Sequence, residues 1–216
     1  MSTADDRPTG PRLTTTSYAI LGLLAVRSSS SYELTRQMGR GLGRIWPRAA
    51  SKLYEEPKKL AALGLARARE GSVGERRRTV YSITPKGRRT LAAWLAEPGA
   101  GPVLESEQLV KLFFADHGTT RDALATIAAA RAWAEERNED NVRVGRAYLG
   151  GEGEFQERVA TNMVVGAFLT ELYRTVAEWA DWAEQVVGRW PEDPRGATLD
   201  REAMEWVVDR AGWSVR

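Results

Sequence analysis

The side chains equipped for chemistry in this 216-residue chain are mainly cations, and most of them lie in its first half. Residues 1–100 hold 18 Lys and Arg against 8 Asp and Glu, whereas residues 101–216 hold 13 against 21. The small net charge of +2 therefore averages a cationic half with an anionic one. Such an asymmetry indicates a part that binds a polyanion joined to a part with another task. Nucleic acid is the polyanion that this pattern favours.

DNA binding needs cations along the path of the phosphates and hydrogen-bonding side chains on a helix that enters the major groove. Arg48 and Lys52 are four residues apart, so a helix that begins near Pro47 carries both on one exposed N-terminal face, where its dipole favours phosphate. Together with Ser51 and Tyr54 they are the candidates for facing the groove. The full set of candidate DNA-binding residues is Tyr32, Arg44, Arg48, Ser51, Lys52, Tyr54, Lys58, Arg67, Arg69, Arg76, Arg77 and Arg78.

Five of these arginines surround a predicted β-hairpin. Arg67 and Arg69 lie on its first strand, and residues 76–78 lie at the tip of its second. This placement suits a hairpin that lies over the DNA backbone or reaches the minor groove, and Arg77 suits either. A merely solvated surface is the alternative, but the run coincides with a hairpin tip and with the large charge excess.

Most enzyme classes are excluded by what the sequence lacks. The absence of cysteine removes disulfides, thiolate metal sites and cysteine nucleophiles, and the single histidine, His117, removes any site that needs two imidazoles. His117 lies between Asp116 and a glycine, which is more typical of a helix end than of a proton relay. No Gly-x-Ser-x-Gly, P-loop or His-Glu-x-x-His sequence is present. We expect no catalytic residue, no cofactor and no metal.

The elements that must position these cations can be read from apolar periodicity and from breakers. Threonine and serine runs suit helix N-caps, Gly64 suits a left-handed helix C-terminus, and Thr84-Pro85 suits the start of another helix. The predicted order is a helix over 17–26, a short helix over 32–38, a third helix over 49–63, strands over 65–69 and 78–83, and a fourth helix from 85 to about 97. Three helices, a hairpin and a fourth helix make a winged helix-turn-helix.

Pro57 lies in the middle of the third predicted helix. Because proline removes a helical donor and clashes with the preceding turn, we expect this helix to be kinked or to begin anew there. Glu55 and Glu56 should then face away from DNA.

The second half of the chain is predicted to be helical throughout. The breaker-rich segment 97–102 marks a linker, and helices are expected over 105–116, 120–149, 153–188 and 199–212. Apolar residues recur every three or four positions along the third of these helices, which favours a long helix packed along a partner helix. The candidate dimer-interface residues on it are Phe155, Val159, Met163, Leu169, Leu172 and Val176.

A compound pattern in the first half resembles that of PadR-type transcriptional regulators. Its parts are Ser-Lys-Leu-Tyr at 51–54, Lys-Lys-Leu at 58–60, Gly-Leu at 64–65, Arg-Thr-Val-Tyr at 78–81 and Thr-Pro-Lys-Gly at 84–87. The resemblance covers about residues 15–97 well and the helical second half more loosely. One departure is Ser31-Tyr32, where members of that family usually have Gly-Tyr. The resemblance implies a repressor whose helical second half forms the dimer interface.

Six of the eight tryptophans lie in the acidic half, at 133, 179, 182, 190, 206 and 213. The resemblance also implies a phenolic or other aromatic effector, and Trp133, Trp179 and Trp182 are the candidates for stacking on it. The alternative is that they fill the dimer core, and for any single tryptophan this packing role is favoured over ligand binding.

We therefore expect a mainly α fold with a small β-hairpin wing. Its predicted parts are a flexible arm over 1–14, a winged helix-turn-helix over 15–98, a helical dimerisation domain over 103–190 and an extension with a short helix over 191–216. The expected protein is a cytoplasmic homodimer without a signal peptide or membrane span, which binds double-stranded DNA at a pseudo-palindromic operator. The alternatives are a winged-helix adaptor that binds proteins and no DNA, and a small helical enzyme, which no motif supports.

Overall fold

The computed structural model describes residues 13–73 and 76–213, without the side chains of residues 40, 72, 73, 76 and 77. The chain divides into two units, Met1–Pro102 and Val103–Arg216. The predicted arm over 1–14 lies almost wholly outside the described residues. The other domain boundaries drawn from the sequence stay predictions.

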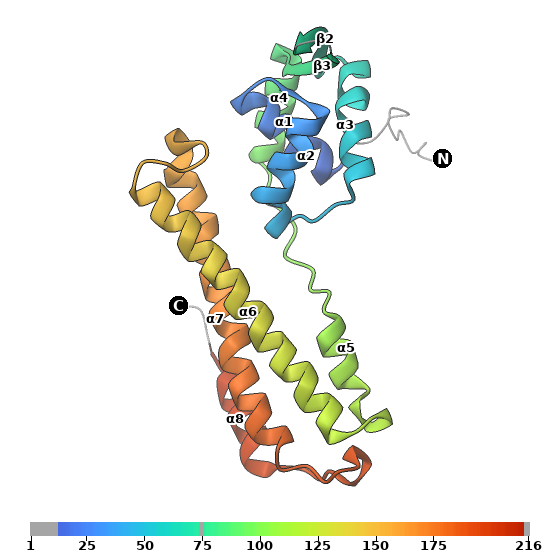
Figure 1. Ribbon diagram of the computed structural model, residues 1–216, viewed down its shortest axis with the longest axis vertical. Helices are drawn as coiled ribbons and strands as arrows, with labels where there is room; N and C mark the ends of the chain where they lie inside the picture. Colours follow the sequence, from blue (N-terminus) through green and yellow to red (C-terminus); the bar gives the residue numbers. More distant parts are fainter. Residues whose placement is uncertain (1–12, 74–75, 214–216) are drawn as a thin grey trace, which may run out of the picture. The chain divides into compact units, whose positions relative to one another are not determined.

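The first unit combines four helices with a small antiparallel sheet (Figure 1). Its elements are α1 (Thr15–Val26), β1 (Ser29–Ser30), α2 (Ser31–Arg40), a 3-10 turn η1 (Leu42–Arg44), α3 (Ala50–Ala62), β2 (Ala66–Val73), β3 (Arg76–Ile83) and α4 (Pro85–Leu95). This order confirms the predicted winged helix-turn-helix with a hairpin wing.

Side-chain hydroxyls cap the starts of α1, α2 and α4. Thr14 accepts a hydrogen bond from the backbone N–H of Ser17, whose own hydroxyl accepts one from the N–H of Thr14. Ser30 and Glu33 form the same reciprocal capping box at the start of α2. Each box satisfies donors that a helix start would otherwise leave unpaired.

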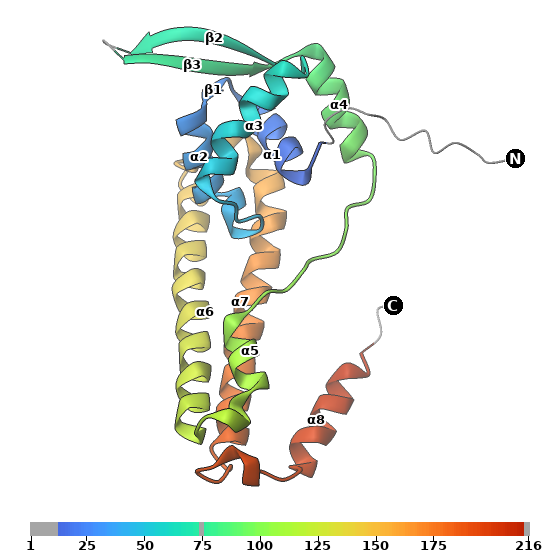
Figure 2. The same ribbon diagram turned by 90° about the vertical axis from the view of Figure 1, so that its right-hand side faces the viewer.

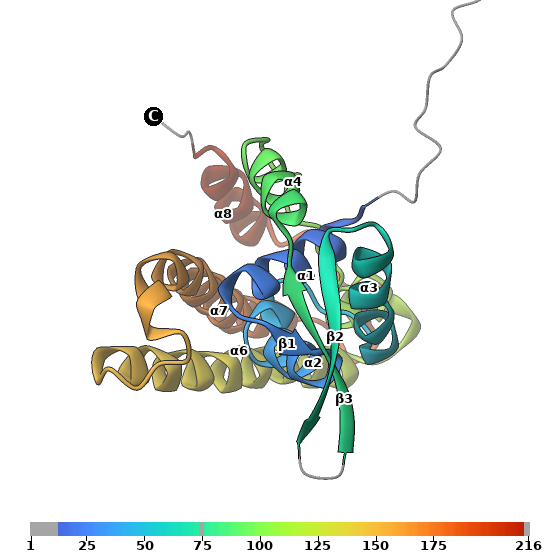
Figure 3. The same cartoon turned by 90° about the horizontal axis from the view of Figure 1, so that it is seen from above.

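The sheet has a third strand that the sequence did not predict. Its order is β1-β3-β2, and β1 pairs with β3 through Ser29 opposite Tyr81 and Ser30 opposite Val80. Figure 3 shows β2 and β3 side by side as the long strands of the wing. Two serines carry no alternating apolar pattern, and their hydroxyls suggested only a helix cap.

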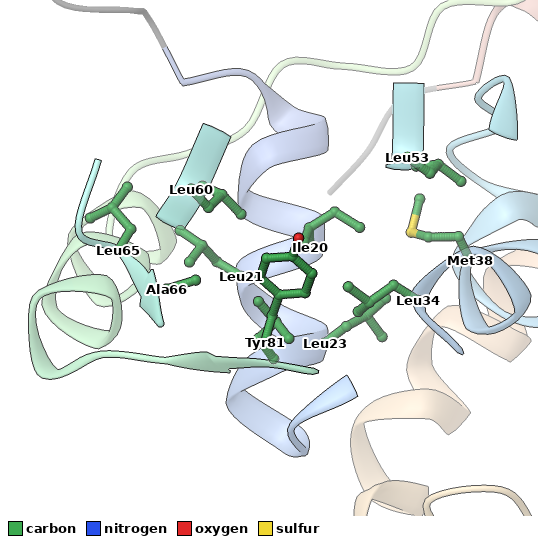
Figure 4. Close-up of a cluster of buried hydrophobic side chains, with 11 residues drawn as sticks. Ile20, Leu21, Leu23, Leu34, Met38, Leu53, Leu60, Leu65, Ala66 and Tyr81 are labelled. Carbon is green, nitrogen blue, oxygen red and sulfur yellow. The ribbon is translucent and has the colours of Figure 1, made fainter. Parts of the chain in front are cut away.

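One hydrophobic core holds the helices of the first unit against the base of the wing (Figure 4). Ile20 and Leu21 of α1, Leu34 of α2 and Leu60 of α3 have no exposed surface, and Tyr81 of β3 is 5% exposed. Helices α1, α2 and α3 therefore form one rigid support for whatever α3 presents on its outer side.

Two glycines have backbone reasons to be glycine. Gly64 ends α3 in the left-handed region with φ of 70°, as predicted. At Gly87 in α4, an added Cβ would lie 2.1 Å from the carbonyl oxygen of Leu65. Only glycine lets α4 approach the chain this closely, which accounts physically for the Thr-x-x-Gly pattern at its start.

The second unit is helical, with α5 (Glu107–Phe113), α6 (Thr120–Leu149), α7 (Val159–Val187) and α8 (Arg201–Ala211). The two long helices α6 and α7 run side by side in opposite directions (Figures 1 and 2). Two clusters join them, one around Ile127 and Ala180 and the other around Ala134 and Leu169. Helix α7 begins later than predicted because Phe155 adopts a left-handed backbone with φ of 57° and a 3-10 turn follows it.

Candidate nucleic-acid interface

Helix α3 is continuous from Ala50 to Ala62, so the expectation that it begins anew at Pro57 was wrong, and the expected kink stays a prediction. Pro57 is fully buried among the core residues and stays inside the helix. Tertiary packing therefore outweighs the lost helical hydrogen bond, as it often outweighs local propensity.

The two faces of α3 differ in character. Leu53, Pro57 and Leu60 are buried. The outer face exposes Ser51, Lys52, Tyr54, Glu55 and Lys58. This exposed face contains each candidate that the sequence placed on the helix itself.

The two glutamates of α3 take different directions. Glu55 lies on the same exposed face as the candidates Lys52 and Tyr54, and its carboxylate pairs with Lys58 at 2.9 Å. Glu56 turns inward, where it accepts hydrogen bonds from Ser17 of α1 and from Lys59. Glu56 thus ties α3 to α1, while Glu55 places a negative charge on the outer face.

Helix α3 begins without a capping side chain. Its N-cap residue is Ala49, which provides no hydrogen-bonding group. The N–H of Lys52 donates to the carbonyl of Ala49, but no side chain of the N-cap residue satisfies the N–H groups of Ala50 and Ser51. Arg48 and Lys52 lie on either side of this start. Both side chains are exposed, and neither pairs with a carboxylate within the part of the chain that the structure describes.

The strand register of the wing sorts its side chains into two faces. Tyr81 and Ala66 are buried against the core, and alternation along the paired strands puts Arg67, Arg69 and Arg78 on the opposite face. All three arginines are exposed. The candidates Arg76 and Arg77 belong to β3 by their backbone, but their side chains lie outside the described residues.

Ion pairs separate the cations of this surface into two groups. Lys58 is paired with Glu55, and the hydrogen bond that its ammonium donates to the Glu55 carboxylate raises the pKa of Lys58. Arg78 is paired with Glu33 at 3.3 Å. The pKa of Glu33 is lowered mainly by hydrogen bonds from the backbone and hydroxyl of Ser30, with a smaller contribution from Arg78.

The cations Arg48, Lys52, Arg67 and Arg69 have no carboxylate partner among the described residues, so their charges are available to phosphates. Tyr32 extends from the first turn of α2 and is 65% exposed. Arg44 ends the 3-10 turn before α3 and is half-buried.

The three candidate effector tryptophans make different contacts. Trp133 of α6 packs edge-to-face on Tyr173, with ring centres 5.6 Å apart. Trp182 of α7 stacks on Trp206 of α8 at 4.6 Å. Trp179 packs against the cluster around Ala180. The ring contacts therefore distribute these indoles among separate partners rather than joining them in one aromatic cage.

The candidate dimer-interface residues divide along α7. Leu169 is 5% exposed, and Leu172 and Val176 pack beside it against the same chain's α6. Met163 is 66% exposed and Val159 is 37% exposed, and Phe155 precedes the helix. The first part of α7 thus leaves its apolar side chains uncovered, whereas the later part is already covered by α6.

The residues that the structure describes hold no group of three acidic or histidine side chains suited to a metal ion. Within the same residues, every helix is too short or too polar to span a membrane.

Three contacts of the site were missed from the sequence. Glu33 pairs with the wing, Trp46 lies under Arg48, and Trp206 covers Trp182. Only Glu33 had a visible signal, the Ser-x-x-Glu spacing of a capping box at 30–33.

Comparisons of the sequence with known proteins match it to transcriptional regulators. The model of the transcriptional regulator PadR-like family matches residues 20–93. The chain is 32% identical over 99 residues to the negative transcriptional regulator PadR of Bacillus subtilis, and 31% identical over 126 residues to the probable transcriptional regulator Rv1176c of Mycobacterium tuberculosis. These matches cover 45% and 53% of this chain and span 54% and 67% of the two relatives.

Solved structures share the fold. The structure of Bacillus subtilis PadR in complex with operator DNA matches with a TM-score of 0.66 at 22% identity, over 81% of this chain and 99% of that one. The same protein in complex with p-coumaric acid matches with a TM-score of 0.64 at 21% identity, over 82% of this chain and 100% of that one.

Proposed function

The chain belongs to the PadR-like family of transcriptional regulators, and from this membership we propose that it represses transcription by binding operator DNA as a homodimer. The family consists of regulators rather than enzymes, in agreement with a sequence that has no catalytic motif. Repression is supported by the Bacillus subtilis relative, which is a negative transcriptional regulator.

The observation that carries the proposal is a set of exposed cations on one winged helix-turn-helix that have no carboxylate partner among the described residues. Arg48 and Lys52 flank the uncapped start of α3, and Arg67 and Arg69 share the outer face of the wing. In this proposal α3 enters the major groove, Ser51 and Tyr54 contact base edges, and the wing arginines neutralise phosphates. The other candidates on this surface are Tyr32, Arg44, Lys58, Arg76, Arg77 and Arg78.

Two copies of the chain explain how a small winged unit reaches useful specificity. A pseudo-palindromic operator with half-sites about one helical turn apart doubles both the base contacts and the phosphate contacts. Exposed apolar side chains on α7, Met163 and Phe168 among them, are suited to burial against a second copy. Sedimentation of the full chain at micromolar concentration should give a dimer, and a monomer would refute this part of the proposal.

The effector in this proposal is a small planar aromatic compound bound in the helical unit. Supporting observations are the complex of Bacillus subtilis PadR with p-coumaric acid and the indoles of Trp133, Trp179 and Trp182. Titration with planar aromatic acids and amines should quench tryptophan fluorescence and release DNA together. If DNA release leaves the fluorescence unchanged, the tryptophans are core residues.

Direct binding tests the proposal. Fluorescence anisotropy with a labelled duplex should show affinity that falls steeply with salt, because phosphate contacts release counterions. Absent or salt-insensitive binding would instead favour a winged-helix adaptor for proteins.

A further inference from the structure

Trp46 is held firmly in the segment between η1 and α3. Its ring is half-buried and packs against the core of the first unit. Its indole Nε1 donates a hydrogen bond of 3.0 Å to the hydroxyl of Thr16, and its backbone N–H donates one of 2.7 Å to the carbonyl of Leu42. The indole is therefore fixed by packing and by two hydrogen bonds from opposite ends of the residue.

Arg48 lies on this fixed ring. The guanidinium carbon is 3.9 Å from the ring centre of Trp46, and Nη1 donates a hydrogen bond of 2.6 Å to the carbonyl of Pro47. Stacking occupies one face of the guanidinium and leaves most of its five N–H donors unused at its edge. Arg48 is exposed and has no carboxylate partner among the residues that the structure describes.

Stacking on Trp46 reduces the conformational entropy that Arg48 loses when it binds a ligand. A free arginine samples many rotamers, and ordering it on a ligand costs conformational entropy. The ring of Trp46 restricts the conformations of Arg48 before a ligand binds. The edge of the guanidinium, which stays exposed, is the part that forms bidentate hydrogen bonds with phosphate oxygens.

We propose that Trp46 is a positioning residue that holds the Arg48 guanidinium for a DNA phosphate. The proposal rests on the proposed function, since it names how one cation of the DNA-binding surface is ordered. Thr16 contributes to this positioning, because its hydroxyl accepts the hydrogen bond from the indole of Trp46 and so fixes the ring.

The test is a double-mutant cycle on the full-length protein with a random-sequence duplex of about three helical turns. We expect Arg48→Ala to weaken binding roughly 10-fold, the scale of a charge-assisted hydrogen bond, and to lower the salt dependence by about one phosphate contact per protomer. Trp46→Leu should weaken binding about 2- to 5-fold through loss of the stacked ring. The protein with both changes should bind like Arg48→Ala alone.

Factors that multiply in the double variant would overturn the proposal, because Trp46 would then act without Arg48. Thr16→Val and Trp46→Phe keep the shape of the site and serve if Trp46→Leu does not fold, as judged by its thermal unfolding. Each of these two changes should weaken DNA binding when Arg48 is present and should have no effect when Arg48 is already replaced by alanine. If neither change affects DNA binding even when Arg48 is present, the proposal is also overturned. Failure of the wild-type protein to bind the duplex would refute the proposed function instead.

Discussion

The wing provides the sharpest prediction, because Arg67 and Arg69 lie together on its outer face. Both side chains are exposed, away from the buried Tyr81 and Ala66 of the other face. Replacing both by alanine therefore removes two charges and no core contact. The free energy of unfolding should change by no more than about 0.5 kcal/mol.

The expected effect on DNA binding follows from counterion release. Each phosphate contact contributes about 0.9 to the slope of log affinity against log salt concentration. A dimer carries four of these arginines, so the double variant should lower the slope by about 3.6. Between about 50 and about 200 mM salt, the wild-type protein should then lose roughly two orders of magnitude more affinity than the variant loses.

The assay is fluorescence anisotropy of a random-sequence duplex over this salt range, with the dimeric state checked by sedimentation. A matched control, Arg158→Ala with Arg201→Ala, removes the same charge from exposed positions of the helical unit. The control should keep the wild-type slope within error. A wing variant that also keeps the wild-type slope would show that the wing does not lie on the DNA backbone.

Three further predictions test other parts of the structure. Glu55→Ala should tighten binding to random DNA about 2- to 5-fold, since it removes an anion from the exposed face of α3 and releases Lys58 from its ion pair; weaker binding would contradict this. Hydrogen bonds from Ser30 hold the pKa of Glu33 below its usual 4.5, so the ionised carboxylate stabilises the folded protein at pH values above 4.5. The wild type should therefore unfold at a higher temperature than Glu33→Gln at neutral pH, and this difference should close as the pH falls through the lowered pKa. A difference that widens there would refute the stabilising role of the ionised Glu33. Gly87→Ala should cost more than about 2 kcal/mol in urea unfolding, because its methyl group would meet a backbone carbonyl, whereas Ala92→Gly on the same helix should cost about 1 kcal/mol.

The elements that the sequence predicted well are those with local signals. Gly64 was expected to end α3, and Thr84-Pro85 was expected to begin α4, because a cap and a breaker act within one turn of the chain. The helix over 120–149 was predicted with the bounds of α6. Such signals depend on neighbouring residues and need no knowledge of the rest of the fold.

The features that were missed depend on residues far apart in the chain. Strand β1 exists because β3 pairs with it, and Pro57 remains helical because the core surrounds it. Trp46 meets Thr16 across 30 positions, and Trp182 meets Trp206 across two helices. Hydrophobic periodicity indicates which face of a helix is buried, but it does not identify the residue that covers that face.

The proposed function requires this chain to recognise a specific DNA sequence as a dimer. The most direct measurement is to incubate the full-length protein with fragments of its own genome and to sequence the fragments it retains at physiological salt. The retained fragments should share a pseudo-palindrome whose half-sites lie about one helical turn apart, and the wing variant should retain none of them. Retained fragments without a shared sequence, or no retention above a control without protein, would contradict it.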